Sequence, residues 1–204
     1  MKALLACFVA LGVLFAAPAM AQIWTEQPDA GDLPGTAQIP VGGGPLTTIS
    51  GTIGASDADM YCIRIDAPAA FRASTCGGTS LDTQLFLFRE NGTGVTHDDD
   101  DSSCAPGTPS TITGTFVSAP GQYLIAVSTY NRDPVGAGGC LIWANSPFNV
   151  ERAPDGACPA SPVTAWTGST TVTGTYTITM TGVSYCGATA VEPATWGAIK
   201  SIYK

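Results

Sequence analysis

Short β-prone runs separated by turn residues constrain the fold of this chain more than any other feature. From residue 46 onward, runs rich in Thr, Val, Ile and Tyr alternate with clusters of Gly, Pro, Asn and Asp. The runs cover residues 46–53, 60–65, 71–75, 81–89, 111–117, 123–130 and 170–181. These residue types favour pleated strands, and no stretch of the region carries a sustained helical period. The pattern predicts an all-β protein, a single antiparallel β-sandwich of jelly-roll type.

The N-terminus has the features of a secretory signal peptide. Lys2 is followed by an uncharged apolar run over residues 4–17, and Ala19 and Ala21 flank a small-residue cleavage signature. The run is shorter than the roughly 20 residues that a membrane-spanning helix needs. We therefore expect residues 1–21 to be cleaved from a secreted protein, with no transmembrane span in the remainder.

The rest of the chain divides into three parts. Residues 22–45, rich in Gly, Pro and Asp, predict an extended lead-in, and residues 46–187 predict the sandwich. Residues 131–162 lack strand signals apart from the run 140–144, and the run 170–181 fits either a strand pair or one long bent strand. Residues 188–204 predict a short helical tail, since Trp196, Ile199 and Tyr203 share one helical face. This tail either docks on the sandwich or serves in sorting or anchoring at the cell surface.

The cysteines indicate an oxidising compartment. Of the seven cysteines, Cys7 lies in the predicted signal peptide, and six remain. An even number in an exported chain predicts three disulfides, and the absence of a CxxC pair argues against zinc. The six candidates are Cys62, Cys76, Cys104, Cys140, Cys158 and Cys186. Among the possible pairs we favour Cys76–Cys104 first and Cys158–Cys186 second.

The charge balance limits the classes of partner. The chain carries 8 Lys and Arg against 16 Asp and Glu, a formal net charge of −8. A chain this acidic is not expected to bind nucleic acid by neutralising phosphates. It is suited instead to cations or basic surfaces.

A hairpin collects many of the acids. Asn91 and Gly92 between two β-prone runs form a strong two-residue turn signal. This turn places Phe88 opposite Val95, Phe86 opposite His97, Gln84 opposite Asp99, and Asp82 opposite Asp101. The alternation of strand residues then puts Asp82, Asp99 and Asp101 on one face, and brings Cys76 and Cys104 to the same end.

Like charges at one hairpin end are destabilising unless water or a cation separates them. Carboxylate oxygens in this number suit Ca²⁺ better than zinc or copper. The two open interpretations are a calcium site and a solvated acidic loop. The candidate ligands are Asp57, Asp59, Asp82, Asp98, Asp99, Asp100 and Asp101.

The sequence argues against an enzyme. His97 is the only histidine, and neither a G-x-S-x-G nor an H-E-x-x-H motif is present. A glycosidase using two carboxylates needs a desolvated acid, and none is evident from the sequence. Three aromatic residues fit either a sugar-binding platform or, as we favour, the core: Tyr130, Trp143 and Trp166.

Several segments together resemble the bacterial pre-peptidase C-terminal (PPC) domain. Residues 57–61 read DADMY, residues 81–88 read LDTQLFLF, and residues 174–182 read GTYTITMTG; the Asn-Gly turn and the aspartates 98–101 lie between them. The resemblance implies a β-sandwich attached to secreted proteins, which binds extracellular polymers such as collagen or glycans and in some members holds calcium. This chain departs from the family in having no accompanying catalytic domain and in the excursion over residues 131–173.

Together these features predict a secreted, non-enzymatic β-sandwich with an extracellular binding or surface-structural role, in which the acidic hairpin end is either a calcium site or a solvated loop. Its expected partner is an extracellular polymer or a component of the bacterial cell surface. The alternative is a carbohydrate-binding module or a carbohydrate-active enzyme.

Overall fold

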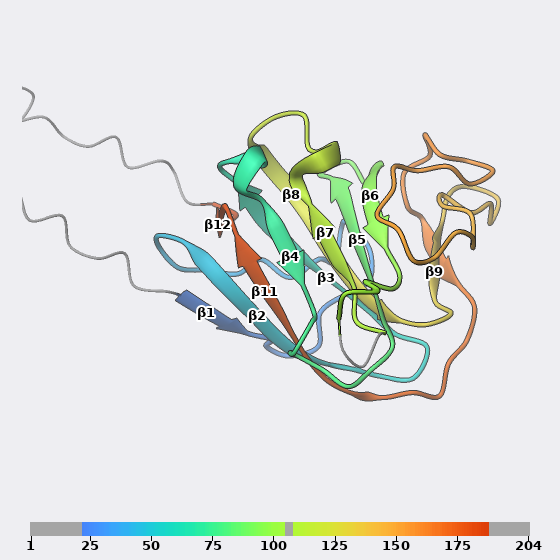
Figure 1. The fold of residues 1–204 in the computed structure, drawn as a ribbon, viewed down its shortest axis with the longest axis horizontal. Helices are drawn as coiled ribbons and strands as arrows, with labels where there is room; N and C mark the ends of the chain where they lie inside the picture. Colours follow the sequence, from blue (N-terminus) through green and yellow to red (C-terminus); the bar gives the residue numbers. More distant parts are fainter. Residues whose placement is uncertain (1–21, 105–107, 188–204) are drawn as a thin grey trace, which may run out of the picture.

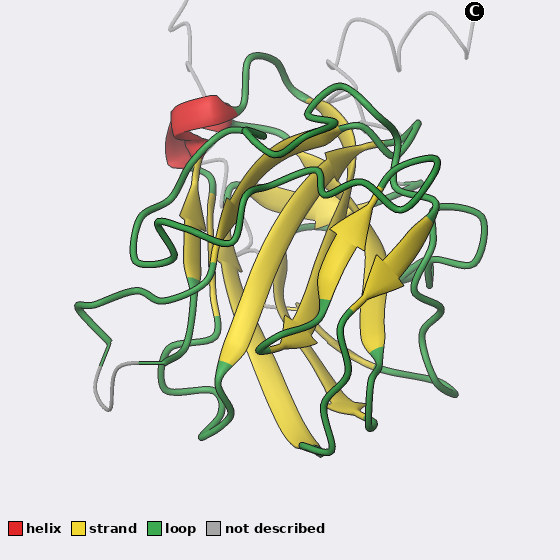
Figure 2. Ribbon diagram, turned by 90° about the vertical axis from the view of Figure 1, so that its right-hand side faces the viewer, coloured by secondary structure: helices red, strands yellow, loops and turns green. Residues whose placement is uncertain are grey.

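The computed structural model describes residues 22–104 and 108–187, and nearly all regular structure within them is β-strand. Two five-stranded sheets pack face to face (Figures 1 and 2). The first sheet has the order β1 (Gln22–Thr25), β2 (Leu46–Ile53), β11 (Gly174–Thr181), β4 (Arg72–Ser74), β7 (Thr111–Thr113). The second has the order β12 (Val183–Tyr185), β3 (Ala58–Ile65), β8 (Gly121–Thr129), β5 (Thr83–Arg89), β6 (Gly94–Asp98). A separate strand pair joins β9 (Asp133–Val135) to β10 (Ala165–Thr167).

The strand order is that of a jelly roll, as the sequence predicted. From β2 to β8 the chain crosses between the sheets at every connection except the β5–β6 hairpin. The eight central strands thereby form two interleaved four-stranded sets, β2-β11-β4-β7 and β3-β8-β5-β6. Every strand pair in the two sheets is antiparallel except β1 with β2, which is parallel.

Most predicted runs are strands, with two exceptions of detail. The run 111–117 forms only β7, which is followed by the 3-10 turn η2 (Gly114–Phe116). A second 3-10 turn, η1 (Pro68–Ala70), precedes β4. The run 140–144 forms no strand. The final run resolves into β11 alone, and β12 follows after Gly182, whose positive φ of 70° lets the chain turn into the other sheet.

Two hydrophobic cores lie on the two faces of the second sheet. The first fills the space between the sheets and includes Leu85 and Leu87. The second lies on the outer face and includes Phe86 and Phe88. Alternate residues of β5 therefore serve different cores, which explains its unbroken apolar run. Residues 131–167, which include β9 and lie beside β6 in Figure 1, cover this outer face.

The lead-in contributes to the sandwich. Strand β1 extends the first sheet, and Trp24 packs against the first core. The Glu26 carboxylate accepts hydrogen bonds from the backbone N–H of Ala30 (2.9 Å) and of Thr52 (2.9 Å), and from the Tyr61 hydroxyl (3.1 Å). Residues 22–30 are thus bonded to both sheets.

Three disulfides are present, as predicted. They are Cys62–Cys186, Cys76–Cys104 and Cys140–Cys158, with Cα–Cα distances of 5.5, 5.6 and 5.8 Å. The predicted Cys76–Cys104 bridge is confirmed, whereas the predicted Cys158–Cys186 bridge is wrong. Strand β12 pairs with β3, which brings Cys186 next to Cys62 and leaves Cys158 to close the excursion with Cys140.

The predicted signal peptide (1–21) and tail (188–204) lie outside the described residues. Over residues 22–104 and 108–187, no helix has the length and apolarity needed to cross a membrane.

Candidate functional site

The β5–β6 hairpin has the predicted register over most of its length. Phe86 lies opposite His97, and Leu85 lies opposite Asp98. Nearer the turn the register shifts, so that Phe88 pairs with Gly94 and the predicted pairing of Phe88 with Val95 is wrong. The backbone N–H of Arg89 bonds to the carbonyl of Thr93, which makes the loop longer than two residues and absorbs the extra residue as a bulge.

Three acids meet where this hairpin ends. Carboxylate oxygens of Asp82, Asp99 and Asp100 lie within 4.8 Å of one another. Asp82 and Asp99 were expected here, but Asp100 stands where the register placed Asp101. The ladder ends at Asp98, and the backbone N–H of Asp100 then bonds to the carbonyl of Phe148 in the excursion, so the strand alternation no longer applies.

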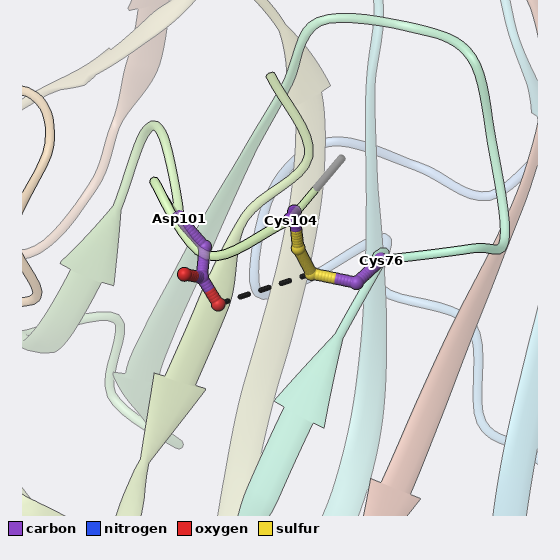
Figure 3. Close-up of side chains that lie close together, drawn as sticks. All are labelled: Cys76, Asp101 and Cys104. Atoms are coloured by element: carbon purple, nitrogen blue, oxygen red, sulfur yellow. Dashed lines mark hydrogen bonds between the residues drawn. A yellow bond between two sulfur atoms is a disulfide. The ribbon is translucent and has the colours of Figure 1, made fainter. Parts of the chain in front are cut away.

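Asp101 turns toward the Cys76–Cys104 disulfide instead (Figure 3). Its Oδ1 accepts hydrogen bonds from the backbone N–H of Ser103 (2.9 Å) and from the Ser103 hydroxyl (2.6 Å). Its Oδ2 lies 3.8 Å from the Sγ of Cys76, which is bonded to Cys104 and has no proton to donate. The bridged cysteines are not available as metal ligands. Asp101 stabilises a turn through its bonds to Ser103 and does not join the acid cluster.

A cavity of about 400 Å³ lies between the outer face of the second sheet and the excursion. Its acidic residues include the three clustered aspartates and Asp133. Its aromatic residues are Tyr130, Trp143 and Phe148. Because the excursion supplies Asp133, Trp143 and Phe148, the segment without predicted strands completes the site.

Asp99 is the most unusual member of the cluster. Its side chain is buried, with 6% of the residue exposed, and its Oδ1 has no hydrogen-bond partner. Burial, followed by the charges of Asp100 and Asp82, raises the pKa of Asp99 to about 7. The expectation that no acid of this hairpin is desolvated was therefore wrong. Within the described residues, no Lys or Arg forms an ion pair with the cluster.

Asp98 points the other way. Its Oδ2 accepts a hydrogen bond of 2.8 Å from the backbone N–H of Thr111 in β7 of the opposite sheet. Burial raises the pKa of Asp98 to about 7. Neighbouring residues of a strand face opposite sides of the sheet, so Asp98 lies away from the cavity. The prediction that Asp98 joins the cluster is therefore wrong.

Asp57 and Asp59 lie apart from the hairpin acids. Asp57 accepts hydrogen bonds from the backbone N–H of Gly54 (3.0 Å) and of Ala58 (2.9 Å), which stabilises the turn before β3. Asp59 is fully buried, accepts a 2.7 Å hydrogen bond from the Tyr176 hydroxyl, and faces the space between the sheets. The cavity is on the opposite face of the second sheet, so the expected convergence does not occur.

Asp59 instead forms a second acidic group. Carboxylate oxygens of Glu26, Asp29 and Asp59 lie within 4.8 Å of one another. Burial, opposed by the hydrogen bond from Tyr176, raises the pKa of Asp59 to about 8. Sequence reasoning missed Glu26 and Asp29 because they lie in the lead-in, where no strand pattern marked them.

His97 is a buried, neutral residue. Its Nε2 accepts a hydrogen bond of 3.1 Å from the Nε–H of Arg152, and its ring stacks on Phe86 at a centroid distance of 5.2 Å. Burial and the charge of Arg152 lower the pKa of His97 to about 3. Since the guanidinium only donates, the proton of His97 is on Nδ1, which has no partner.

Arg152 was not singled out in the sequence, and it organises this part of the excursion. It forms an ion pair of 2.6 Å with Asp155 and donates to the carbonyls of Ala144 and Ser146. Its position, 55 residues from His97, gave no local signal.

The predicted aromatic platform does not form as a group of three. Trp143 and Trp166 are buried in the second core, packed on Phe86 at centroid distances of 5.5 and 5.4 Å. This confirms the favoured interpretation of the two tryptophans as core residues. Tyr130 is 58% exposed, and Phe148, which the sequence did not single out, is 51% exposed. Both line the cavity.

Comparison of the chain with protein-family models, and with curated protein sequences, gave no match. The resemblance to the PPC domain therefore stays a prediction. Chemically, the site offers several carboxylate oxygens at one point, an unpaired oxygen among them, and an adjoining cavity. Hard oxygen donors of this kind suit a divalent cation such as Ca²⁺.

Proposed function

We propose that the protein is a secreted, non-enzymatic β-sandwich of PPC type that binds Ca²⁺ through Asp82, Asp99 and Asp100 and uses the adjoining cavity to bind an extracellular polymer. The observation that carries the proposal is the buried Asp99 carboxylate, whose Oδ1 has no partner and lies among other carboxylates. A buried charge without a partner is costly, and a bound cation supplies that partner.

The donor set fits calcium better than the other common metals. Three carboxylates offer up to six oxygens, and Ca²⁺ takes six to eight oxygen ligands in flexible geometry. His97 is not a ligand, because its Nε2 already accepts from Arg152. The ion would neutralise charges that otherwise repel one another across the end of the hairpin.

A binding role accounts for the site better than catalysis does. Arg152 bonds to the only histidine, whose pKa is lowered by burial and by the Arg152 charge, and among the described residues no Ser, Thr or Cys side chain forms a hydrogen bond with that histidine. A retaining glycosidase places two carboxyl groups about 5 to 5.5 Å apart on either side of a bond. Three acids here converge on one point, with carboxylate oxygens within 4.8 Å of one another, and this convergence supports a metal site more than a pair of acids flanking a bond.

The extracellular setting is supported by the cysteines. Three disulfides within the described residues are typical of proteins in oxidising compartments. The predicted signal peptide supports the same location. An extracellular polymer or a cell-surface component is the partner we propose, as the PPC resemblance implies.

The test of calcium binding is a pair of melting curves, with calcium and with a chelator. Extracellular calcium modules have dissociation constants of about 0.1–1 mM. Calcium at ten times the dissociation constant adds about 1.4 kcal/mol to the free energy of unfolding. We expect the wild-type midpoint to rise by about 3 to 6 °C. Asp99→Asn, which keeps the shape and removes the charge, should show no rise.

The control is Asp66→Asn, which alters an exposed aspartate paired with Arg64 on the surface. It should respond to calcium as the wild type does. In chelator, Asp99→Asn should be at least as stable as the wild type, because one of the repelling charges is gone. A wild-type midpoint that calcium leaves unchanged, or an equal rise in Asp99→Asn, would refute the site.

A further inference from the structure

The cavity beside the acid cluster is much larger than one ion requires. Its volume of about 400 Å³ falls within the range of small-molecule sites, about 300–1,000 Å³. A cation held against the cluster would face this space with part of its coordination open. The remaining ligands of the ion would then come from water or from a bound molecule.

The donors around the cavity indicate the chemistry of that molecule. Asn131 and Asn145 line it, and their exposed side-chain amides form no hydrogen bond within the described residues. The site therefore presents unpaired N–H donors together with carboxylate acceptors. Hydroxyl groups satisfy both kinds, because each donates and accepts.

Two exposed aromatic rings add a surface for stacking. Tyr130 and Phe148 line the cavity and are 58% and 51% exposed. Aromatic rings are enriched at interfaces, and these two offer their faces to a ligand in the cavity.

We infer that the cavity is a calcium-dependent site for a neutral carbohydrate. Two adjacent hydroxyls of a sugar complete the coordination of the ion, other hydroxyls pair with the amides of Asn131 and Asn145, and the sugar ring stacks on Tyr130 or Phe148. This inference rests on the proposed calcium site and names the class of ligand for it.

The charges of the site set its preference. The carboxylates of Asp82, Asp99, Asp100 and Asp133 carry more negative charge than one Ca²⁺ and the cavity-lining Arg152 neutralise together, so uronic acids and sulfated sugars are disfavoured. An organic cation would pair with the acids but would leave the amide N–H groups of Asn131 and Asn145 without acceptors. Neutral polyols are therefore the class that satisfies the greatest number of groups.

The test is binding of the mature chain to an array of immobilised neutral and uronic-acid glycans, with calcium and with a chelator. The glycans bound are then titrated by calorimetry. We expect neutral glycans to bind in calcium only. Tyr130→Ala and Phe148→Ala change exposed side chains and should each weaken this binding by about tenfold, with the calcium affinity of each variant measured in parallel. The matched control is Val150→Ala, an exposed residue of the same loop that does not line the cavity.

The outcomes separate the two proposals. Calcium binding without binding of any neutral glycan on the array would overturn the carbohydrate site and leave the proposed function standing. Glycan binding that persists in chelator, or that both aromatic variants retain, would overturn it as well. Binding of butylamine in chelator would show an organic-cation pocket instead. Absence of calcium binding itself would refute the proposed function.

Discussion

At the scale of single residues, Asp59 shows how burial and not sequence context decides a carboxylate's behaviour. It is fully buried and faces Glu26, Asp29 and Tyr176, and Asp57 also acts on it. Burial raises its pKa from the ordinary value of 3.8 to about 8. The folded chain thus binds this proton more tightly than the unfolded chain does.

The consequence is a stability that falls as pH rises. The contribution of Asp59 is fully present below about pH 3.8 and is lost progressively up to about pH 8. Asp59→Asn is neutral throughout, so its stability relative to the wild type should increase between pH 4 and pH 8. Thermal unfolding in chelator over this range measures the difference. Parallel curves of stability against pH for the wild type and Asp59→Asn would contradict the prediction. The control variant Asp66→Asn should match the wild type.

Arg152 is a second residue whose role comes from tertiary contacts. It is 9% exposed, and it bonds to His97, to Asp155 and to two backbone carbonyls of the excursion. Arg152→Met removes these bonds and leaves buried acceptors unpaired, so we expect a loss of about 2 to 4 kcal/mol in the free energy of unfolding. Urea unfolding measures it. The exposed Arg89→Met should lose less than about 0.5 kcal/mol, and equal losses in both variants would contradict the role of Arg152.

At the scale of elements, the strand pattern predicted much of the sandwich. The run 46–53 matches β2 residue for residue, and most of the other runs contain their strands. The Asn-Gly turn also gave the register between Phe86 and His97. These features depend on local residue types and on alternation, which a sequence displays directly.

The site was only partly predictable, for a physical reason. The meeting of Asp82 with Asp99 followed from the hairpin register, but Asp100 replaced Asp101 because the ladder ends at Asp98. Phe148 and Arg152 lie in an excursion without strands, and their positions depend on packing against a distant sheet face. No periodic pattern records that kind of contact.

The lead-in provides an element-scale prediction. Glu26 accepts from the backbone N–H groups of Ala30 and Thr52 and from the Tyr61 hydroxyl, and so joins residues 22–30 to both sheets. Glu26→Ala should lower the free energy of unfolding by about 1 to 3 kcal/mol, because these donors lose their acceptor. Glu90→Ala, in the exposed hairpin loop, is the matched control. Denaturant midpoints that shift equally for the two variants would show that the lead-in is not anchored in this way.

At the scale of the whole molecule, the three disulfides of the described residues cross-link different parts of the fold. Cys62–Cys186 links the last strand to β3, Cys76–Cys104 links the end of β4 to the turn after the acid cluster, and Cys140–Cys158 lies within the excursion. The last of these closes a loop of 18 residues, for which chain entropy predicts a contribution of about 3 kcal/mol.

Replacing Cys140 and Cys158 by serine should therefore loosen the excursion more than the sandwich. Hydrogen exchange should accelerate over residues 131–167, while β2, β3 and β8 keep their protection. Mass spectrometry of exchanged peptides measures both regions in one experiment. Uniform acceleration across all strands would show instead that the excursion and the sandwich unfold as one unit.

We propose that Asp82, Asp99 and Asp100 together hold a calcium ion beside the cavity. The most direct measurement is a crystal structure of the mature protein grown with millimolar calcium, with anomalous data to identify the ion. We predict an anomalous peak about 2.3–2.6 Å from carboxylate oxygens of all three aspartates. A structure without that peak, or with the ion only at Glu26, Asp29 and Asp59, would contradict the account.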